Sequence, residues 1–173
     1  QSFSGTHSYY LYVSNIDTLV TATSVIRRNL FNQRSFQNEP LYYVDLDTYI
    51  NDYHANSIHL VEMPEGEPPR LMIVKSLPLG VYGQPKATLF QILGEDVLPD
   101  LLDSISYDIF AQVMLLSEDG RVIACNSDQT PKFFPATEEL QGSYGQFECS
   151  IDGEEQLVFY SEIPALKGFQ CVM

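Results

Sequence analysis

The second half of the chain contains the stretch that decides the fold: Ala111-Gln-Val-Met-Leu-Leu-Ser117, then Glu118-Asp119-Gly120, then Arg121-Val-Ile-Ala-Cys125. Apolar and β-branched residues fill the first and third parts, and turn-forming residues fill the middle part. The stretch therefore predicts a β-hairpin. A segment without clear periodicity follows, and then come three strand-like runs, residues 143–151, 155–163 and 169–173.

The first half of the chain repeats this order of elements. Its strand-like runs are residues 9–13, 18–23, 57–63, 70–77 and 86–93. The first two runs are joined by the polar turn at residues 15–17, and a weakly patterned stretch separates them from the last three. Within that stretch, Asp45 or Asp47 can cap a short helix. The two halves share the order of elements but little residue-level identity.

Residues 94–105 change from a period of two to a period of about 3.6 and predict a connecting helix. The order of elements in each half resembles that of a PAS-like module, which has two strands, then a crossover segment, then three antiparallel strands. We therefore expect an α+β fold with two such modules in tandem, each an antiparallel sheet of about five strands with helical crossover segments. The predicted modules are residues 1–93 and residues 94–173, the second including the helix.

The charge balance excludes one class of function. The chain has 23 acidic residues against 9 Lys and Arg, which gives a net charge of −14. Such a protein is repelled by phosphate backbones and by anionic bilayers, so we expect no direct binding of nucleic acid. With 45% hydrophobic residues, the chain is nevertheless too apolar to be a disordered acidic tail.

The chain is expected to be a soluble piece of a longer polypeptide. It contains no run of about 18 apolar residues that could span a membrane, and its first residues do not resemble a signal peptide. The three cysteines, Cys125, Cys149 and Cys171, are 24 and 22 residues apart and match no Cys-x-x-Cys pattern. Each lies among apolar residues, so we predict buried free thiols.

Three stretches of the sequence resemble a known family of sensors. They are Ser8-Tyr-Tyr-Leu-Tyr-Val-Ser-Asn-Ile-Asp-Thr-Leu-Val-Thr, Arg70-Leu-Met-Ile-Val-Lys-Ser-Leu-Pro with its continuation from Tyr82-Gly83 to Leu93, and Val113-Met-Leu-Leu-Ser-Glu-Asp-Gly-Arg-Val-Ile-Ala. In order and spacing they are similar to the extracytoplasmic double Cache region of bacterial membrane-anchored AraC-type transcription regulators. Sensor histidine kinases of the same bacteria have similar regions.

This resemblance implies a function and a location. The chain would be a non-catalytic, extracytoplasmic sensor that binds an unknown small molecule. The parent chain would be anchored in the membrane, would form a homodimer, and would signal to a cytoplasmic DNA-binding domain that this fragment lacks. The sensor domain of a histidine kinase or of a chemoreceptor is the alternative.

The sequence also departs from the family in two ways. Family members begin with a long helix that mediates dimer contact, whereas this chain starts close to its first strand. One large Cache subgroup binds amino acids through a pattern that includes Arg and Trp, and this chain has no Trp. An amino-acid ligand is therefore not assumed.

No catalytic or metal-binding pattern is present in the sequence. His54 and His59 are five residues apart, which suits no standard metal-ligand spacing, and no Cys lies near them. The nucleophile-elbow, P-loop and dinucleotide-binding motifs are all missing. We therefore expect neither an enzyme nor a metal or cofactor site.

Tyrosines and one lysine are the candidate ligand-binding residues. Tyr10 and Tyr12 share one face of the first strand, and the candidates Tyr43 and Tyr82 add further hydroxyl groups near the expected pocket. Lys75 interrupts an apolar strand on the side of Leu71, Ile73 and Leu77. If that side lines the ligand cavity, Lys75 can contact a ligand carboxylate; a structural salt bridge to an acidic residue is the alternative.

Three other functions stay open at this point. A cytoplasmic PAS-type interaction module is compatible with free cysteines, since disulfides are rare in that compartment. A small hydrolase or isomerase would need a nucleophile and a base, and the sequence assigns neither. An acidic adhesin-like module is the third.

Overall fold

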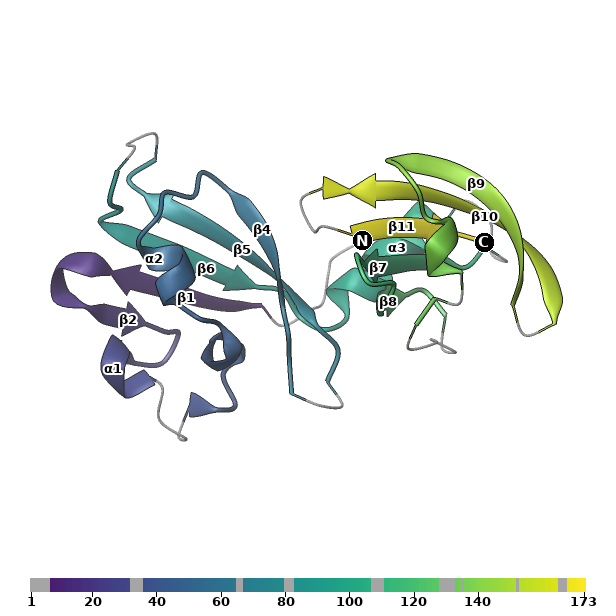
Figure 1. Ribbon diagram of the computed structural model, residues 1–173. Helices are drawn as coiled ribbons and strands as arrows, with labels where there is room; N and C mark the ends of the chain where they lie inside the picture. The colour runs from purple at the N-terminus through teal and green to yellow at the C-terminus, as the bar shows by residue number, and fades with distance from the viewer. Residues whose placement is uncertain are drawn as a thin grey trace. The chain divides into compact units, whose positions relative to one another are not determined.

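The computed structural model describes residues 7–31, 36–64, 67–79, 83–106, 111–127, 133–134, 136–151, 153–164 and 168–173. The chain divides into two compact units, Gln1–Glu95 and Asp96–Met173 (Figure 1). Each unit contains one antiparallel sheet. None of the helices in these ranges is both long enough and apolar enough to cross a membrane.

The described part of the first unit forms a six-stranded sheet. Its strands are β1 (Ser8–Val13), β2 (Thr18–Val20), β3 (Val25–Arg27), β4 (Ser57–Val61), β5 (Arg70–Leu77) and β6 (Ala87–Ile92). Their order across the sheet is β3-β2-β1-β6-β5-β4, and every neighbouring pair is antiparallel. The first strand of the unit therefore pairs with the last, and these two strands form the centre of the sheet.

Short helices and connecting loops cover one face of this sheet. They are α1 (Arg28–Phe31), the 3-10 helix η3 (Pro40–Tyr43) and α2 (Asp47–Ile50) (Figure 1). Apolar side chains of these helices pack with the sheet in one core, to which the helices contribute Phe31, Leu41 and Ile50 and the strands contribute Tyr10, Tyr12, Met72, Val74, Phe90 and Ile92. We call residues 28–31 and 36–54 the covering segment, and the sheet face beneath them the covered face.

The described part of the second unit repeats the order β2-β1-β6-β5-β4 of the first, without a counterpart of β3. It comprises α3 (Val97–Ile105), β7 (Val113–Ser117), β8 (Val122–Cys125), the 3-10 helix η4 (Thr137–Glu139), β9 (Tyr144–Ile151), β10 (Glu154–Ile163) and β11 (Gly168–Val172). The order β8-β7-β11-β10-β9 again places the first strand beside the last, with antiparallel neighbours throughout. In α3, Leu98 and Leu102 are buried, whereas Leu101 and Ile105 are exposed.

The predicted α+β class with antiparallel sheets and few helices is confirmed. The second sheet has five strands and the first has six, close to the expected number of about five, because β3 adds one strand to the first sheet. This strand has three residues, of which Val25 and Arg27 are exposed. It therefore shows little of the apolar alternation by which the longer strands could be recognised.

Candidate functional site

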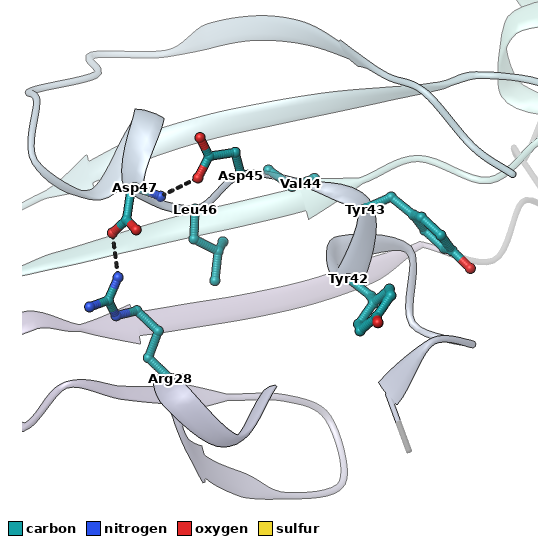
Figure 2. Close-up of a pocket in the computed structure, with 7 residues that line it drawn as sticks. All are labelled: Arg28, Tyr42, Tyr43, Val44, Asp45, Leu46 and Asp47. Carbon is teal, nitrogen blue, oxygen red and sulfur yellow. Dashed lines mark hydrogen bonds and ion pairs between the residues drawn. The ribbon is translucent and has the colours of Figure 1, made fainter. Parts of the chain in front are cut away.

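A pocket of about 340 Å³ lies in the covering segment of the first unit. Arg28, at the start of α1, forms one wall, and residues 42–47, which run from the end of η3 to the start of α2, form the other (Figure 2). The lining combines one cation, two carboxylates and aromatic side chains. A small molecule in this pocket would meet charged and hydrogen-bonding groups beside a smaller apolar surface.

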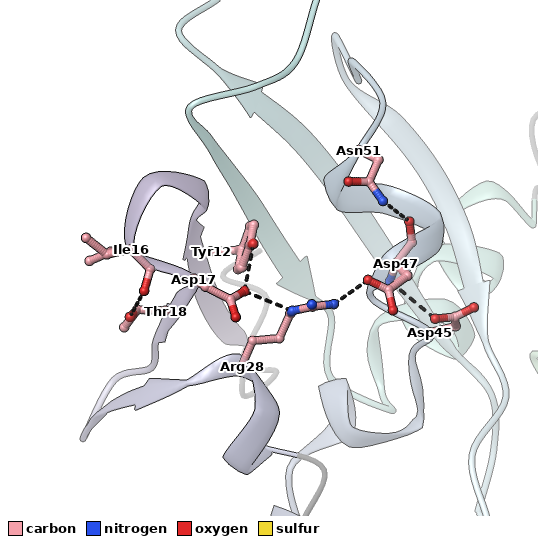
Figure 3. Close-up of polar contacts among 8 residues, drawn as sticks. All are labelled: Tyr12, Ile16, Asp17, Thr18, Arg28, Asp45, Asp47 and Asn51. Carbon is pink, nitrogen blue, oxygen red and sulfur yellow. Dashed lines mark hydrogen bonds and ion pairs between the residues drawn. The ribbon is translucent and has the colours of Figure 1, made fainter.

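Arg28 bridges two carboxylates at this pocket. Its Nε donates a hydrogen bond to Oδ1 of Asp17 at 2.9 Å, and its Nη1 contacts Oδ1 of Asp47 (Figure 3). Partial burial of Arg28 opposes its charge, but the hydrogen bond to Asp17 and the charges of both carboxylates raise its pKa above the ordinary value. The bridge therefore fixes the cation between β1–β2 and α2.

Asp17 holds this bridge from the sheet side. The residue has φ 47°, in the left-handed region that Asp tolerates better than most residues, and it ends the turn between β1 and β2. The hydroxyl of Tyr12 donates a hydrogen bond of 2.9 Å to the same Oδ1 atom that accepts from Arg28. Burial and this hydrogen bond raise the pKa of Tyr12, so Tyr12 stays a donor at neutral pH.

Asp45 fixes the opposite wall of the pocket. Its Oδ1 accepts the backbone N–H of Asp47 at 3.2 Å, and its Oδ2 accepts the hydroxyl of Thr48 at 3.1 Å. The N-cap of α2 is Leu46, without a side-chain cap hydrogen bond, so the cap predicted at Asp45 or Asp47 is wrong. Asp45 instead holds the first turn of α2 from the residue before the N-cap, and the Asp47 carboxylate points toward Arg28 (Figure 2).

Three of the five sequence candidates lie on or under the covering segment. Tyr10 and Tyr12 are both buried on the covered face, and Tyr43 lines the pocket. Tyr10 donates a hydrogen bond of 2.6 Å to Glu39, and Tyr43 donates one of 2.8 Å to the carbonyl of Gln37. The hydroxyl groups of Tyr10 and Tyr43 therefore already donate hydrogen bonds within the protein.

The other two candidates do not join them. Lys75 lies on the uncovered face of the sheet, because Met72, Val74 and Ser76 are the buried positions of β5 and Lys75 has the opposite parity. The premise that the side of Lys75 lines the cavity is therefore wrong, and within the described ranges no carboxylate forms an ion pair with it. Tyr82 lies outside the described residues.

Sequence reasoning missed the residues that the structure brings together at the pocket. Arg28 and Asp47 are 19 positions apart and lie in the part of the chain with the weakest periodicity. The sequence does show a turn at Asp17 and the basic pair Arg27-Arg28 in a weakly apolar stretch. Neither feature identifies the carboxylate that pairs with Arg28.

Sequence reasoning also missed a cluster around Ser57. The Ser57 hydroxyl lies 3.0 Å from Nδ1 of His54 and 2.8 Å from Nε2 of His59. The rings of Tyr49 and His59 pack edge to face with centroids 4.7 Å apart. Burial and the neighbouring His54 lower the pKa of His59. Within the described ranges, no carboxylate is hydrogen-bonded to either imidazole, so a Ser-His-acid triad is not assembled there.

The described residues contain no group of three or more His, Cys, Asp or Glu side chains that could hold a metal ion. Two imidazoles meet at Ser57, but a metal site needs further ligands.

A second, smaller pocket adjoins the first at Tyr43. It has a volume of about 290 Å³ and lies between the loop before η3 and the facing ends of β4 and β5. Gln37, Asn38, Glu67 and Arg70 supply its polar groups.

Comparison with known proteins shows the fold. No protein-family model matches the chain, and no curated protein sequence matches it. Among solved structures, the ligand-binding domain of the Campylobacter jejuni chemoreceptor Tlp3, in complex with 4-methylisoleucine, matches 95% of this chain and 63% of that chain, with 13% identity and a TM-score of 0.57. This chain therefore spans less than two thirds of the Tlp3 domain.

Two further structures have similar values. The ligand-binding domain of the Pseudomonas aeruginosa PAO1 amino acid chemoreceptor PctB, in complex with L-Arg, matches 95% of this chain and 69% of that chain, with 14% identity and a TM-score of 0.57. The extracellular domain assigned to a histidine kinase, rpHK1S-Z16, matches 95% and 68%, with 9% identity and a TM-score of 0.53. The chain thus has the Cache-type fold of extracellular ligand-binding domains from chemoreceptors and histidine kinases.

Proposed function

We propose that this chain is the extracytoplasmic, non-catalytic sensor region of a membrane-anchored bacterial receptor, and that it binds a small molecule in the pocket between Arg28 and residues 42–47. The observation that carries the proposal is the Asp17–Arg28–Asp47 bridge at a pocket of about 340 Å³. The fold supports it, because solved structures with this fold are ligand-binding domains of receptors.

The charges at the pocket favour a ligand that carries an ammonium group. Asp17, Asp45 and Asp47 supply three negative charges, and Arg28 supplies one positive charge. A cationic group beside Asp47 would reduce this excess of negative charge. The Tlp3 and PctB structures hold 4-methylisoleucine and L-Arg, which both carry such a group. Since this chain lacks Trp, we propose a small amine as the ligand class without restricting it to amino acids.

Binding would act on the bridge itself. A ligand ammonium group that pairs with Asp47 competes with Arg28 for the same carboxylate. Competition would separate α2 from α1 and shift the covering segment between two arrangements, and a ligand shifts such an equilibrium by its difference in affinity for the two states. Arg28 and Asp47 would thus serve both recognition and signalling.

The output domain is a separate question. A chemoreceptor or a histidine kinase agrees better with the structural comparisons than an AraC-type regulator does. The AraC-type regulator is the second candidate, and the sequence resemblance at residues 8–21, 70–93 and 113–124 supports it. A tandem pair of Cache modules and a homodimer of the parent chain also belong to this proposal. The coding sequence next to this chain distinguishes the outputs, because each has a different cytoplasmic domain.

A thermal-shift screen tests the proposal. The panel contains putrescine, ethanolamine, L-arginine, L-isoleucine, acetate and glucose, and we expect stabilisation by at least one of the amines. A ligand at 100 times its dissociation constant adds about 2.7 kcal/mol to the free energy of unfolding. Asp47→Asn should abolish that stabilisation. Asp52→Asn, an exposed acid five positions further along, is the matched control and should keep it.

Two results would count against this function. If no amine stabilises the protein, the ligand class is wrong. If an amine stabilises the parent and the Asp47→Asn variant equally, the ligand binds elsewhere.

A further inference from the structure

Arg70 is the cation of the second pocket. It is the first residue of β5 and belongs to the covered face, since it shares the parity of Met72 and Val74. Its side chain is only 19% exposed. The pocket beside it, of about 290 Å³, is also lined by the amide side chains of Gln37 and Asn38.

Among the residues that the structure describes, none forms a hydrogen bond with the guanidinium of Arg70. Its Nε is buried and has no hydrogen bond. Its Nη2 lies 3.6 Å from Oε2 of Glu67 and 3.9 Å from Oε2 of Glu95, and both distances exceed that of a hydrogen bond. The two carboxylates therefore offset the charge of Arg70 without satisfying its donors. A buried N–H without a partner is unfavourable, and an acceptor that reaches it relieves this cost.

The donor geometry favours one class of acceptor. A guanidinium presents its N–H groups in a planar fork that matches the two oxygens of a carboxylate. Glu67 lines the pocket and Glu95 lies close to Arg70, so a ligand with two negative charges would be repelled more strongly than one with a single charge. The amides of Gln37 and Asn38 can donate further hydrogen bonds to the same oxygens.

We infer that Arg70 and the adjoining amides form a second binding site, specific for the carboxylate group of a small monoanionic or zwitterionic molecule. This site goes beyond the proposed amine pocket, and its existence does not depend on what that pocket binds. Tyr43 lines both pockets, so the two proposed sites share one side chain. The site also places the anion contact five residues before Lys75 and on the other face of β5.

An NMR titration of the whole ¹⁵N-labelled chain tests this site. The Arg Nε–H resonances are followed while sodium acetate, sodium phosphate at pH 7.5, or sodium chloride is added. We expect acetate to shift the Arg70 Nε–H signal in a saturable way. Phosphate should bind more weakly than acetate, and chloride should leave the signal close to its starting position.

Three variants make the outcome specific. Arg70→Gln should weaken acetate binding by roughly tenfold or more, since it removes a charge-assisted donor pair. Glu67→Gln, at a position where the side chain is 50% exposed, should tighten acetate binding by roughly threefold, because it removes a neighbouring negative charge. Arg27→Gln, which removes an exposed arginine outside both pockets, should bind acetate like the parent.

The inference is overturned by any of four results. They are equal, non-saturating shifts with acetate and chloride, tighter binding of phosphate than of acetate, unchanged acetate affinity in Arg70→Gln, and unchanged or weaker affinity in Glu67→Gln. Because the Glu67 variant retains Arg70, its result stands even if the Arg70 variant folds poorly.

Discussion

The phenol of Tyr10 donates a hydrogen bond of 2.6 Å to Oε2 of Glu39 and thereby joins β1 to the covering segment. Tyr10 is 2% exposed, and its ring packs edge to face against Phe31 of α1. Burial and the Glu39 carboxylate both raise the pKa of Tyr10 far above its ordinary value, so the hydroxyl stays protonated. The bond is therefore a charge-assisted link between the sheet and the covering segment.

Removing this link should destabilise the first unit. Tyr10→Phe keeps the packing of the ring but removes the donor, so Glu39 loses a partner in a partly buried place. We expect a loss of about 2 kcal/mol in the free energy of unfolding, measured by urea denaturation. Tyr9→Phe is the matched control, because Tyr9 is 50% exposed and lies on the opposite face of the same strand. Equal losses in the two variants would show that the Glu39 contact is of no special importance.

Lys75 should be dispensable for ligand binding. It lies on the uncovered face, whereas the two pockets and the core beneath the covering segment belong to the other side. We expect Lys75→Ala to bind an identified amine with the affinity of the parent, and to change the free energy of unfolding by less than about 1 kcal/mol. Isothermal titration calorimetry measures the first quantity. A tenfold loss of affinity would mean that the uncovered face takes part in binding.

Most of the strands could be predicted from the sequence because they have a local signature, whereas the three-residue β3, with two exposed residues, has none. In β5, Met72, Val74 and Ser76 alternate with less buried residues, and the turn at Gly120 separates two apolar runs. Parity correctly placed Tyr10 and Tyr12 on one face and grouped Lys75 with Leu71 and Ile73. Parity cannot say which face another segment will cover, and this is why the side assigned to Lys75 was wrong.

The candidate site could be predicted less well, for the same reason. Arg28 meets Asp17 and Asp47 through a covering segment that has only short helices and little periodicity. Such contacts depend on how loops fold back on a sheet, and no local pattern encodes them. His54 and His59 illustrate the point, because their spacing suits no metal motif, yet both rings meet at Ser57.

The His59 imidazole should make stability depend on pH. Burial, and then the adjacent His54, lower its pKa in the folded protein, so the unfolded chain binds this proton more strongly. The contribution of His59 is therefore fully present above the unfolded pKa of about 6.5 and is lost as the pH falls through the lower pKa of the folded state. We expect the free energy of unfolding, measured in urea, to decrease between about pH 7.5 and pH 5.5.

His59→Gln tests the origin of this decrease. Glutamine stays neutral over the same range and can still reach the Ser57 hydroxyl, so the variant should show a smaller decrease than the parent. The ring of Tyr49 and the imidazole of His54 pack against His59, and both remain in the variant. If the two proteins lose stability in parallel, other groups cause the dependence on pH.

The cysteines of the second unit should differ in reactivity. Burial, and then the neighbouring Cys149, raise the pKa of the Cys171 thiol to about 12, so only about one molecule in ten thousand carries the thiolate at pH 8. Cys125 and Cys171 are buried, whereas Cys149 is partly exposed at the edge strand β9. Because the thiolate is the reactive form, we expect Ellman's reagent to modify Cys149 slowly in the folded protein and all three thiols in urea.

Cys149→Ser should abolish the reaction of the folded protein and leave the other two thiols reactive in urea. Rapid modification of Cys171 in the folded protein, located by mass spectrometry, would mean that β11 opens far more readily than its place between β7 and β10 implies.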